Sequence, residues 1–192
     1  KGTSVNVLEN FNLEIKAGET VAFVGETGSG KSTIVNLICR FYEPTTGKIL
    51  IDGKDYKERS VEWLRSKLGY VLQTPQLFGG TIMENVRYGK LDATDEEIIE
   101  ACKLVNAHSF ISKLPDGYNT DLGEGGNKLS LGEKQLISFA RAIVANPSLL
   151  VLDEATSSID TENEKAIIAA MNKVMKNRTS LIVAHRLSTV VN

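Results

Sequence analysis

A glycine-rich stretch, Val21–Thr33, constrains this chain more than any other part of its sequence. Val21–Val24 is a short apolar run of β-forming residues, and the segment Gly25–Ser32 that follows fits the pattern G-x-x-x-x-G-K-[ST]. Apolar residues then recur at helical spacing, at Ile34, Leu37, Ile38 and Phe41. The pattern therefore predicts a strand, a phosphate-binding loop and a helix in direct succession, which is the context that this motif requires.

The residue types in this loop suit a polyphosphate. Glycines allow successive backbone N–H groups to turn toward an anion, and a helix that begins near Lys31 adds partial positive charge there. The Lys31 amine would reach the β- and γ-phosphates, and the Ser32 hydroxyl would ligate Mg²⁺. We expect the nucleotide-binding set to comprise Gly25, Glu26, Thr27, Gly28, Ser29, Gly30, Lys31, Ser32 and Thr33. The alternative is a glycine-rich turn without a ligand, which the agreement of strand, loop and helix disfavours.

The composition is that of an ordinary globular protein and argues against several other classes. Hydrophobic residues make up 42% and charged residues 24% of the 192 positions. Lys and Arg number 22 against 24 Asp and Glu, so no basic surplus indicates nucleic-acid binding. No apolar run approaches the ~20 residues that cross a bilayer, and no signal peptide opens the chain. Cys39 and Cys102 lie far apart without a C-x-x-C pairing, which disfavours a metal cage or a disulfide framework.

Apolar patterning indicates an α/β fold. Alternation over Leu8–Ile15 and a turn at Lys16–Glu19 predict a β-hairpin that leads into the Val21 strand, as an N-terminal antiparallel β part. Further strands are predicted at Lys48–Asp52, Gly69–Leu72, Leu149–Leu152 and Ser180–Ala184, with helices at Val61–Lys67 and Glu162–Lys176. Because apolar strands alternate with helices, we expect a mainly parallel sheet flanked by helices on both faces.

Residues 75–145 are predicted to form an inserted helical lobe. Thr94 and Glu97 form a capping box ahead of an apolar stripe at Ile98, Cys102 and Val105. Another helix begins near Ser130 and stops before Pro147, with Leu136, Phe139, Ala140 and Ile143 on one face. The remaining residues, 1–74 and 146–192, would form the core that carries the phosphate loop.

Two carboxylates follow the predicted strand Leu149–Leu152. Asp153 and Glu154 then lie at the carboxyl edge of the sheet, where open α/β sheets bind ligands. Beside a phosphate loop, Asp153 is the expected Mg²⁺ acid together with Ser32, and Glu154 is placed to polarise a water as general base. A pair of solvated acids at a strand end is the alternative interpretation.

Other polar residues also follow strands or begin helices. His185 ends a predicted strand and can donate to a γ-phosphate or hold the attacking water, although a lone histidine is more often structural. Gln73 can offer an amide to Mg²⁺ or to that water. Ser130 and Gly132 combine a hydroxyl, an amide and a helix N-terminus, which suits a second anion site. The alternative there is a plain Ser130 N-cap with Glu133 completing a capping box.

In their order along the chain, these segments resemble the nucleotide-binding domain of ATP-binding cassette transporters, over nearly the whole chain. Gly25–Thr33 resembles the Walker A motif and Gln73 the glutamine loop, while Leu129–Glu133 is similar to the signature motif. Leu149–Glu154 then resembles Walker B, Ser157–Asp160 the D-loop, and His185 the switch histidine. The runs Leu77–Asn85 and Thr120–Gly126 are most similar to the exporter branch, in which the latter faces the coupling helices of membrane domains.

The resemblance implies a P-loop NTPase that binds and hydrolyses ATP with Mg²⁺. The implied catalytic residues are Glu154, His185 and Gln73, and the implied metal ligands are Ser32, Gln73 and Asp153. Two such domains would pair head to tail and close two ATP molecules between Walker A of one and Ser130 and Gly132 of the other. Closure would drive the membrane domains of an exporter at the cytoplasmic face of the cell membrane, with no nucleic acid as partner.

This sequence departs from the family pattern in three places. Leu131 and Glu133 replace the third and fifth residues of the usual Leu-Ser-Gly-Gly-Gln signature. Thr120–Gly126 lacks the arginine often found next to its last glycine. The aromatic residue that stacks on adenine would lie upstream of Lys1 and the closing strands beyond Asn192, so we expect residues 1–192 to be one domain truncated at both ends.

Three other functions are open to a chain with these motifs. A soluble cassette ATPase of DNA repair or chromosome structure would need a long coiled-coil insertion, and no sustained heptads occur. A GTPase would continue Asn172-Lys173 as Asn-Lys-x-Asp, but Met175 stands in place of the aspartate. A regulatory cassette that closes on ATP without turnover is disfavoured by Glu154 and His185 and favoured by the altered signature. The partner domain implied by the resemblance is either a second copy of this sequence or an unlike chain.

Overall fold

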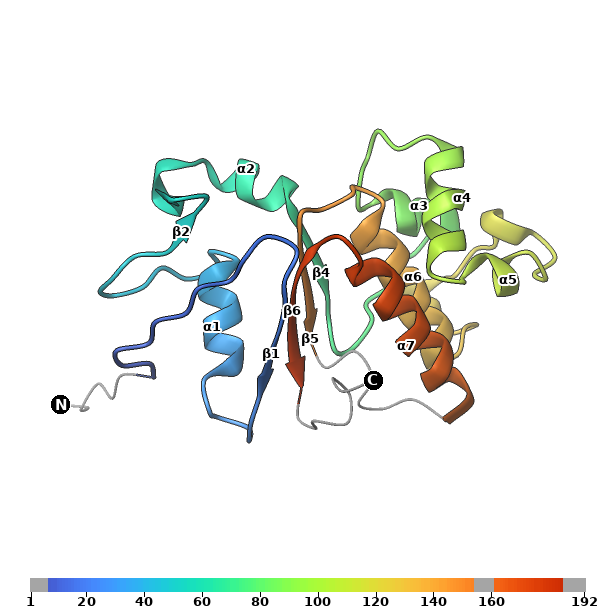
Figure 1. The fold of residues 1–192 in the computed structure, drawn as a ribbon. Helices are drawn as coiled ribbons and strands as arrows, with labels where there is room; N and C mark the ends of the chain where they lie inside the picture. The colour runs from blue at the N-terminus through green and yellow to red at the C-terminus, as the bar shows by residue number, and fades with distance from the viewer. Residues whose placement is uncertain (1–6, 154–160, 185–192) are drawn as a thin grey trace.

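The computed structural model describes residues 7–153 and 161–184, with the side chains of 161–164 excepted (Figure 1). Its centre is a parallel four-stranded sheet in the order β1-β6-β5-β4. The strands are β1 Thr20–Val24, β4 Leu68–Val71, β5 Leu149–Asp153 and β6 Thr179–Ala184. Strands that neighbour in space are thus far apart in sequence, as the crossovers of a parallel sheet require. The α/β fold with a mainly parallel sheet is confirmed.

Helices cover both faces of this sheet. On one face, Val35 of α1 (Lys31–Ile38) and Cys39, which directly follows this helix, pack against Val151 and Val183. On the other face lie α6 (Leu131–Ile143) and α7 (Thr161–Met175), to the right of the sheet in Figure 1. Alternate residues of a strand point to opposite faces, so a strand between two helical layers needs apolar residues on both. This explains why β5 and β6 are almost entirely apolar.

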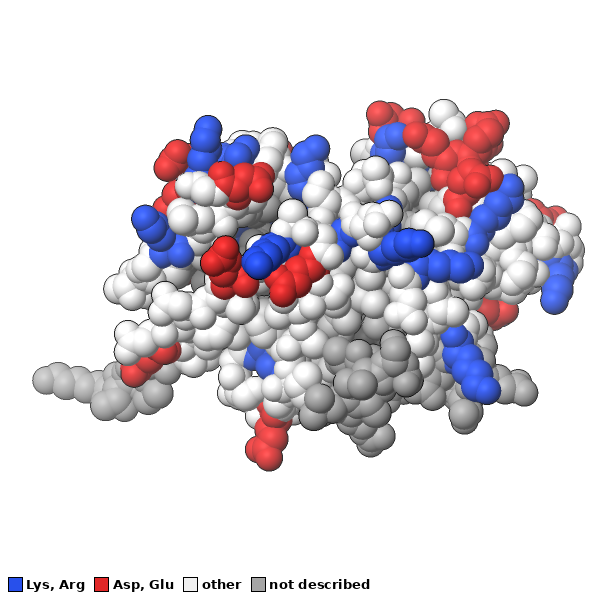
Figure 2. Space-filling view, viewed as in Figure 1, with Lys and Arg blue, Asp and Glu red and all other residues white. Residues whose placement is uncertain are grey.

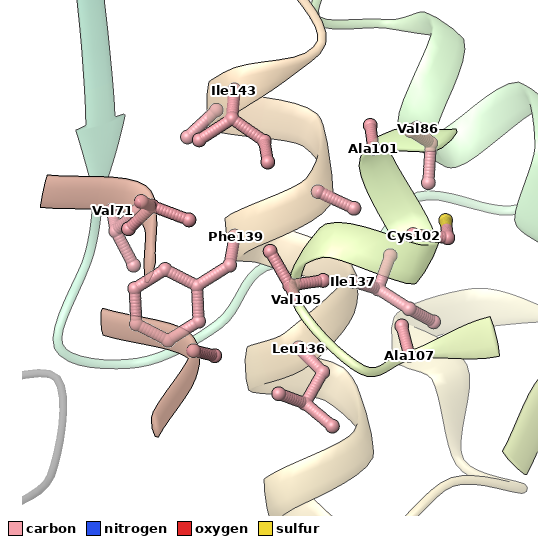
Figure 3. Packing of buried hydrophobic residues seen from close by; sticks show 14 of the residues in the cluster. Val71, Val86, Ala101, Cys102, Val105, Ala107, Leu136, Ile137, Phe139 and Ile143 are labelled. Atoms are coloured by element: carbon pink, nitrogen blue, oxygen red, sulfur yellow. The ribbon is translucent and has the colours of Figure 1, made fainter. Parts of the chain in front are cut away.

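The larger hydrophobic core extends from the sheet through α6 to the helices beyond it. In Figure 3, Phe139 points from α6 toward Val71 of β4, whereas Ile137 points toward Cys102 of α4 (Asp95–Leu104). The side chains of Phe139, Ile137 and Cys102 have no exposed surface. Because α6 is buried on both sides, it connects the sheet to the helical part of the chain within one continuous core.

The helical part contains α3 (Ile82–Arg87), α4 and α5 (His108–Ile111) besides α6. Three of its helices begin with capping boxes in which both reciprocal hydrogen bonds are present, at Thr81 with Glu84, Thr94 with Glu97, and Ser130 with Glu133. The box predicted at Thr94 is confirmed. Each box satisfies backbone N–H groups that a helix start leaves unpaired.

The N-terminal β-hairpin prediction is wrong. No residue between Val7 and Glu19 belongs to a strand, and β1 pairs with β6 in parallel instead. Alternation at Phe11 and Leu13 leaves both side chains about half exposed, at 50% and 46%, and only Ile15 of this alternating set packs on the core under α1. The reason is that an alternating segment forms a strand only where a partner edge is available, and no described strand lies beside this one.

A small antiparallel sheet does occur in the N-terminal half. It joins β2 (Leu50–Ile51) to β3 (Lys54–Asp55) across a tight turn at Asp52-Gly53, followed by a 3₁₀ turn at Tyr56–Glu58 and α2 (Val61–Ser66). The two turn residues have φ of 52° and 74°. Both values suit the type I′ turn that favours Asp-Gly. The predicted strand over Lys48–Asp52 is therefore present but shorter.

Charged side chains of both signs are mixed over the face shown in Figure 2, and acidic ones gather over α4 at its upper right. The first turn of α4 contains Asp95, Glu96 and Glu97, which suits the positive end of a helix dipole. Within residues 7–153 and 161–184, no helix combines the length and the apolar character needed to cross a membrane.

Candidate phosphate-binding site

The glycine-rich loop lies where β1 ends and α1 begins, as the motif predicts. Gly28 and Gly30 have φ of 87° and 91°, in the left-handed region that favours glycine. Gly30 is also buried, and a Cβ added there would lie 3.1 Å from Leu8 Cδ2. The backbone course of the loop and the close approach of the N-terminal segment therefore both require glycine at position 30.

Lys31 points back into this loop. Its side chain is only 8% exposed, and the Nζ amine donates to the carbonyl oxygens of Gly25 at 2.7 Å and Glu26 at 2.8 Å. It also lies 3.4 Å from Ser29 Oγ. The amine is thus surrounded by neutral oxygens, and none of these three hydrogen-bond partners is a carboxylate, so an incoming anion would gain a charge partner there.

The start of α1 leaves its backbone donors available. No side chain caps the helix at Gly30, and its first turn contains no acidic residue. A cavity of about 170 Å³ opens at this point, lined by Val7, Thr27, Gly28, Gly30, Lys31, Ser32 and Thr33. A buried cation, uncapped N–H groups and a cavity are what a phosphate chain needs. The residues present therefore fit such a group, and Val7 is a lining residue that no sequence pattern indicated.

Asp153 ends β5 on the same face of the sheet that α1 covers. It lies beside Val183 of β6, which in turn lies beside Phe23 of β1, two residues before Gly25. Adjacent strands are separated by roughly 4.8 Å, so Asp153 is about 10 Å across the sheet from the strand that leads into the loop. The half-buried carboxylate offers the hard oxygen ligands that Mg²⁺ prefers, on the face of the sheet that α1 covers.

A tyrosine that the sequence analysis did not single out contacts this aspartate. The Tyr70 hydroxyl of β4 donates to Asp153 Oδ2 at 3.3 Å. Burial, and then the nearby Asp153 charge, raise the pKa of Tyr70 above its ordinary value. The hydroxyl therefore keeps its proton at neutral pH and remains a donor.

Gln73 follows β4 by two residues and is exposed. The neighbouring Leu72 carbonyl accepts a hydrogen bond from Gln135 Nε2 at 3.4 Å. Gln135 belongs to α6 and is only 1% exposed. The segment that contains Gln73 is therefore hydrogen-bonded to α6, the helix that begins at the predicted signature segment.

The signature segment forms the start of α6. Ser130 is the exposed N-cap, its Oγ accepts from the Glu133 N–H at 3.3 Å, and its own N–H donates to Glu133 Oε2 at 2.8 Å. Gly132 is buried in the first turn. The capping-box geometry considered as the alternative interpretation is thus present, and it holds the Glu133 carboxylate beside the backbone donors of this helix start.

Glu154, the predicted D-loop residues Ser157–Asp160 and His185 lie outside the described residues.

Segments 77–85 and 120–126, which both resemble the exporter branch, are hydrogen-bonded to each other in the structure. The Ile82 N–H donates to the Thr120 carbonyl at 3.2 Å, and the Leu122 N–H donates to the Gly80 carbonyl at 2.9 Å. An antiparallel bridge connects Thr81 with Asp121 between them.

The order of strands, the glycine loop and the acid at the end of β5 define a P-loop nucleotide-binding fold. The family model for ABC transporters matches residues 8–157. The chain therefore belongs to the ABC transporter family.

Several relatives match nearly the whole chain. It is 53% identical over 186 residues to ABC transporter B family member 13 of Arabidopsis thaliana, covering 97% of this chain and 15% of that protein. It is 55% identical over 183 residues to the uncharacterized ABC transporter ATP-binding protein YfiC of Bacillus subtilis (strain 168), covering 95% of this chain and 30% of that protein. A solved bacterial Atm1-family ABC exporter with ATP bound matches with a TM-score of 0.88 and 45% identity, covering 97% of this chain and 32% of that one. The chain thus spans a third or less of each of these proteins.

Proposed function

We propose that this chain is the ATP-binding and ATP-hydrolysing domain of an ABC exporter, and that it powers substrate transport across a membrane. The observation that carries the proposal is the buried Lys31, which is 8% exposed and whose amine faces backbone oxygens within the glycine loop. The likeness to an exporter solved with ATP bound supports the choice of nucleotide and of subclass. A P-loop lysine contributes mainly as a positive point charge for the β- and γ-phosphates.

The loop residues would bind and orient the triphosphate. Backbone N–H groups of the glycine loop and of the uncapped start of α1 would donate to phosphate oxygens, and Lys31 would exchange its neutral carbonyl partners for charged ones. Ser32, Asp153 and Gln73 would hold Mg²⁺, which supplies charge neutralisation at the β- and γ-phosphates when it is bound.

Hydrolysis would depend on residues that follow β5 and β6. Glu154 comes directly after Asp153 at the carboxyl end of β5, where a carboxylate can accept a proton from the attacking water. His185 comes directly after Ala184, the last residue of β6, and would hold that water or donate to the γ-phosphate. Gln73 would take part from the neighbouring strand end, because β4 and β5 pair in parallel and end at the same edge.

We further propose two kinds of partner. A second nucleotide-binding domain would contribute its Ser130 and Gly132 to the ATP held by this chain, so that each site is completed across the dimer. The membrane domains of the transporter would contact the surface of the helical lobe, residues 75–145, at the cytoplasmic face of the membrane. The exposed rings of Phe78 and Tyr88, with centroids 4.8 Å apart, lie in that lobe, within and just after segment 77–85, and suit such an interface.

The experiment that tests the nucleotide site is Lys31→Ala in the full-length protein, measured by calorimetric titration with Mg·ATP. We expect most of the ATP affinity to be lost, because no other described cation lines the cavity at the loop. Lys48→Ala is the matched control, since Lys48 is exposed in a loop away from the cavity. Unchanged ATP binding in Lys31→Ala would remove the glycine loop from the site.

A further inference from the structure

Tyr70 is the one polar side chain in β4, and the sheet brings it to Asp153 from 83 residues away in sequence. In the parallel register, Tyr70 lies beside Val151, so Asp153 is two residues further along β5 on the same face. Two residues span about 6.7 Å along a strand, which a tyrosine side chain can bridge when it leans along the strand. The contact therefore follows from the register of the sheet.

The ring of Tyr70 is held in place by its surroundings. It packs with the core under α1, and the Phe41 ring lies 5.9 Å away at an interplanar angle of 47°. An aromatic pair with this separation is within the favourable range. Since the ring is packed at its base, the hydroxyl at its tip has a defined position relative to Asp153.

An aspartate carboxylate rotates readily about its last torsion, because that torsion has broad minima. A donor on one oxygen restricts this rotation and leaves the other oxygen available for a metal. Partners of this kind orient metal-ligating carboxylates, and their loss typically lowers metal affinity 10- to 100-fold. A tyrosine hydroxyl suits the task because it donates without adding a charge beside the cation.

We propose that Tyr70 is a positioning residue for the divalent metal: its hydroxyl donates to Asp153 Oδ2 and orients the carboxylate before Mg²⁺ and nucleotide bind. This inference rests on the proposed function, since that function assigns Asp153 to the metal. Tyr70 would itself contact neither metal nor phosphate. It would raise the affinity for the metal and would not affect the contacts that the glycine loop makes with a nucleotide when no metal is bound.

The test is Tyr70→Phe in the full-length protein, with Mn²⁺ as a spectroscopic probe for Mg²⁺ and a non-hydrolysable ATP analogue. Electron paramagnetic resonance would measure the Mn²⁺ affinity of the protein–analogue complex. We expect Tyr70→Phe to weaken it about 10-fold or more, whereas binding of the analogue in EDTA stays as in the wild type. Tyr118→Phe is the matched control. It removes a hydroxyl that lies 2.9 Å from His108 Nδ1 in the helical lobe, and Mn²⁺ affinity should not change.

Asp153→Asn distinguishes a failure of the inference about Tyr70 from a failure of the proposed metal site. If Asp153→Asn loses Mn²⁺ affinity and Tyr70→Phe does not, the inference about Tyr70 is overturned while the metal role of Asp153 stands. If Asp153→Asn keeps full Mn²⁺ affinity, the proposed metal site itself is wrong. A lower unfolding temperature of Tyr70→Phe in EDTA, with normal Mn²⁺ affinity, would show a purely structural role. Tyr70→Leu, which also removes the hydroxyl and keeps an apolar side chain, decides the question if Tyr70→Phe does not fold.

Discussion

Gly89→Ala should destabilise the helical part of the chain, because the backbone after α3 passes unusually close to α6. A Cβ at Gly89 would lie 2.0 Å from the Arg141 carbonyl oxygen and 2.9 Å from Val144 Cγ1. The nearest atom is backbone, so no rotation of a side chain can relieve the contact. Either the end of α3 or the α6 backbone must shift by more than ~1 Å to restore an ordinary contact distance.

The free-energy cost of this shift depends on how closely the core around Gly89 is packed. Val86, three residues before Gly89, and Ile143 of α6 belong to the same closely packed core. Overpacking such a core typically costs 1–3 kcal/mol, and a clash between two backbones belongs at the upper end, at about 3 kcal/mol. For a domain of this size, that corresponds to a fall of roughly 6–12 °C in Tm.

Gly79→Ala is the matched control, since a Cβ at this exposed glycine would have no neighbour within 4 Å. Its effect should stay within about 0.5 kcal/mol. Thermal unfolding followed by far-UV circular dichroism compares the two variants with the wild type. Equal Tm values for Gly89→Ala and Gly79→Ala would refute the close approach of α3 and α6.

Three further predictions concern the chemistry. Glu154→Gln should keep ATP binding but slow hydrolysis about 10²- to 10⁴-fold, with an ATP-bound dimer accumulating in size-exclusion chromatography; turnover that persists with only monomer present would exclude Glu154 as the base. In mixed dimers of two copies of this sequence, Lys31→Ala on one chain and Ser130→Arg on the other should keep measurable ATPase activity, whereas both changes on one chain should abolish it. Equal activities would contradict head-to-tail pairing. Burial raises the pKa of Cys39 and Cys102 from 9.0 to about 12, so both thiols should resist iodoacetamide at pH 8 until the protein unfolds. Since an unfolded thiol ionises more readily than a buried one, the free energy of unfolding should fall as pH rises from about 9 toward 12, and urea unfolding at pH 8 and 10 would detect this.

The features that could be predicted from the sequence are those whose physical cause lies within a few neighbouring residues. The glycine loop is one, because its glycines, Lys31 and the start of α1 are contiguous. The capping box of Thr94 and Glu97 is another, since the two residues satisfy each other across one helical turn. The tight turn at Asp52-Gly53 also has a local cause, because these two residues themselves adopt the positive φ values that the turn requires.

The incorrect prediction of an N-terminal β-hairpin shows which features a local pattern does not determine. Leu8–Ile15 alternates like a strand, but strand formation depends on a partner edge that local pattern does not reveal. The strand order β1-β6-β5-β4 also differs from the order along the chain, and it places Asp153 two strands away from Phe23.

Motif order along the chain was enough to indicate the family and the residues of the phosphate loop. Tertiary structure was needed to place Tyr70 against Asp153, Gln135 against Leu72, and segment 77–85 against segment 120–126. These contacts join segments that are distant in sequence. They arise from strand register and from an α6 buried on both sides, so no local pattern of residue types encodes them.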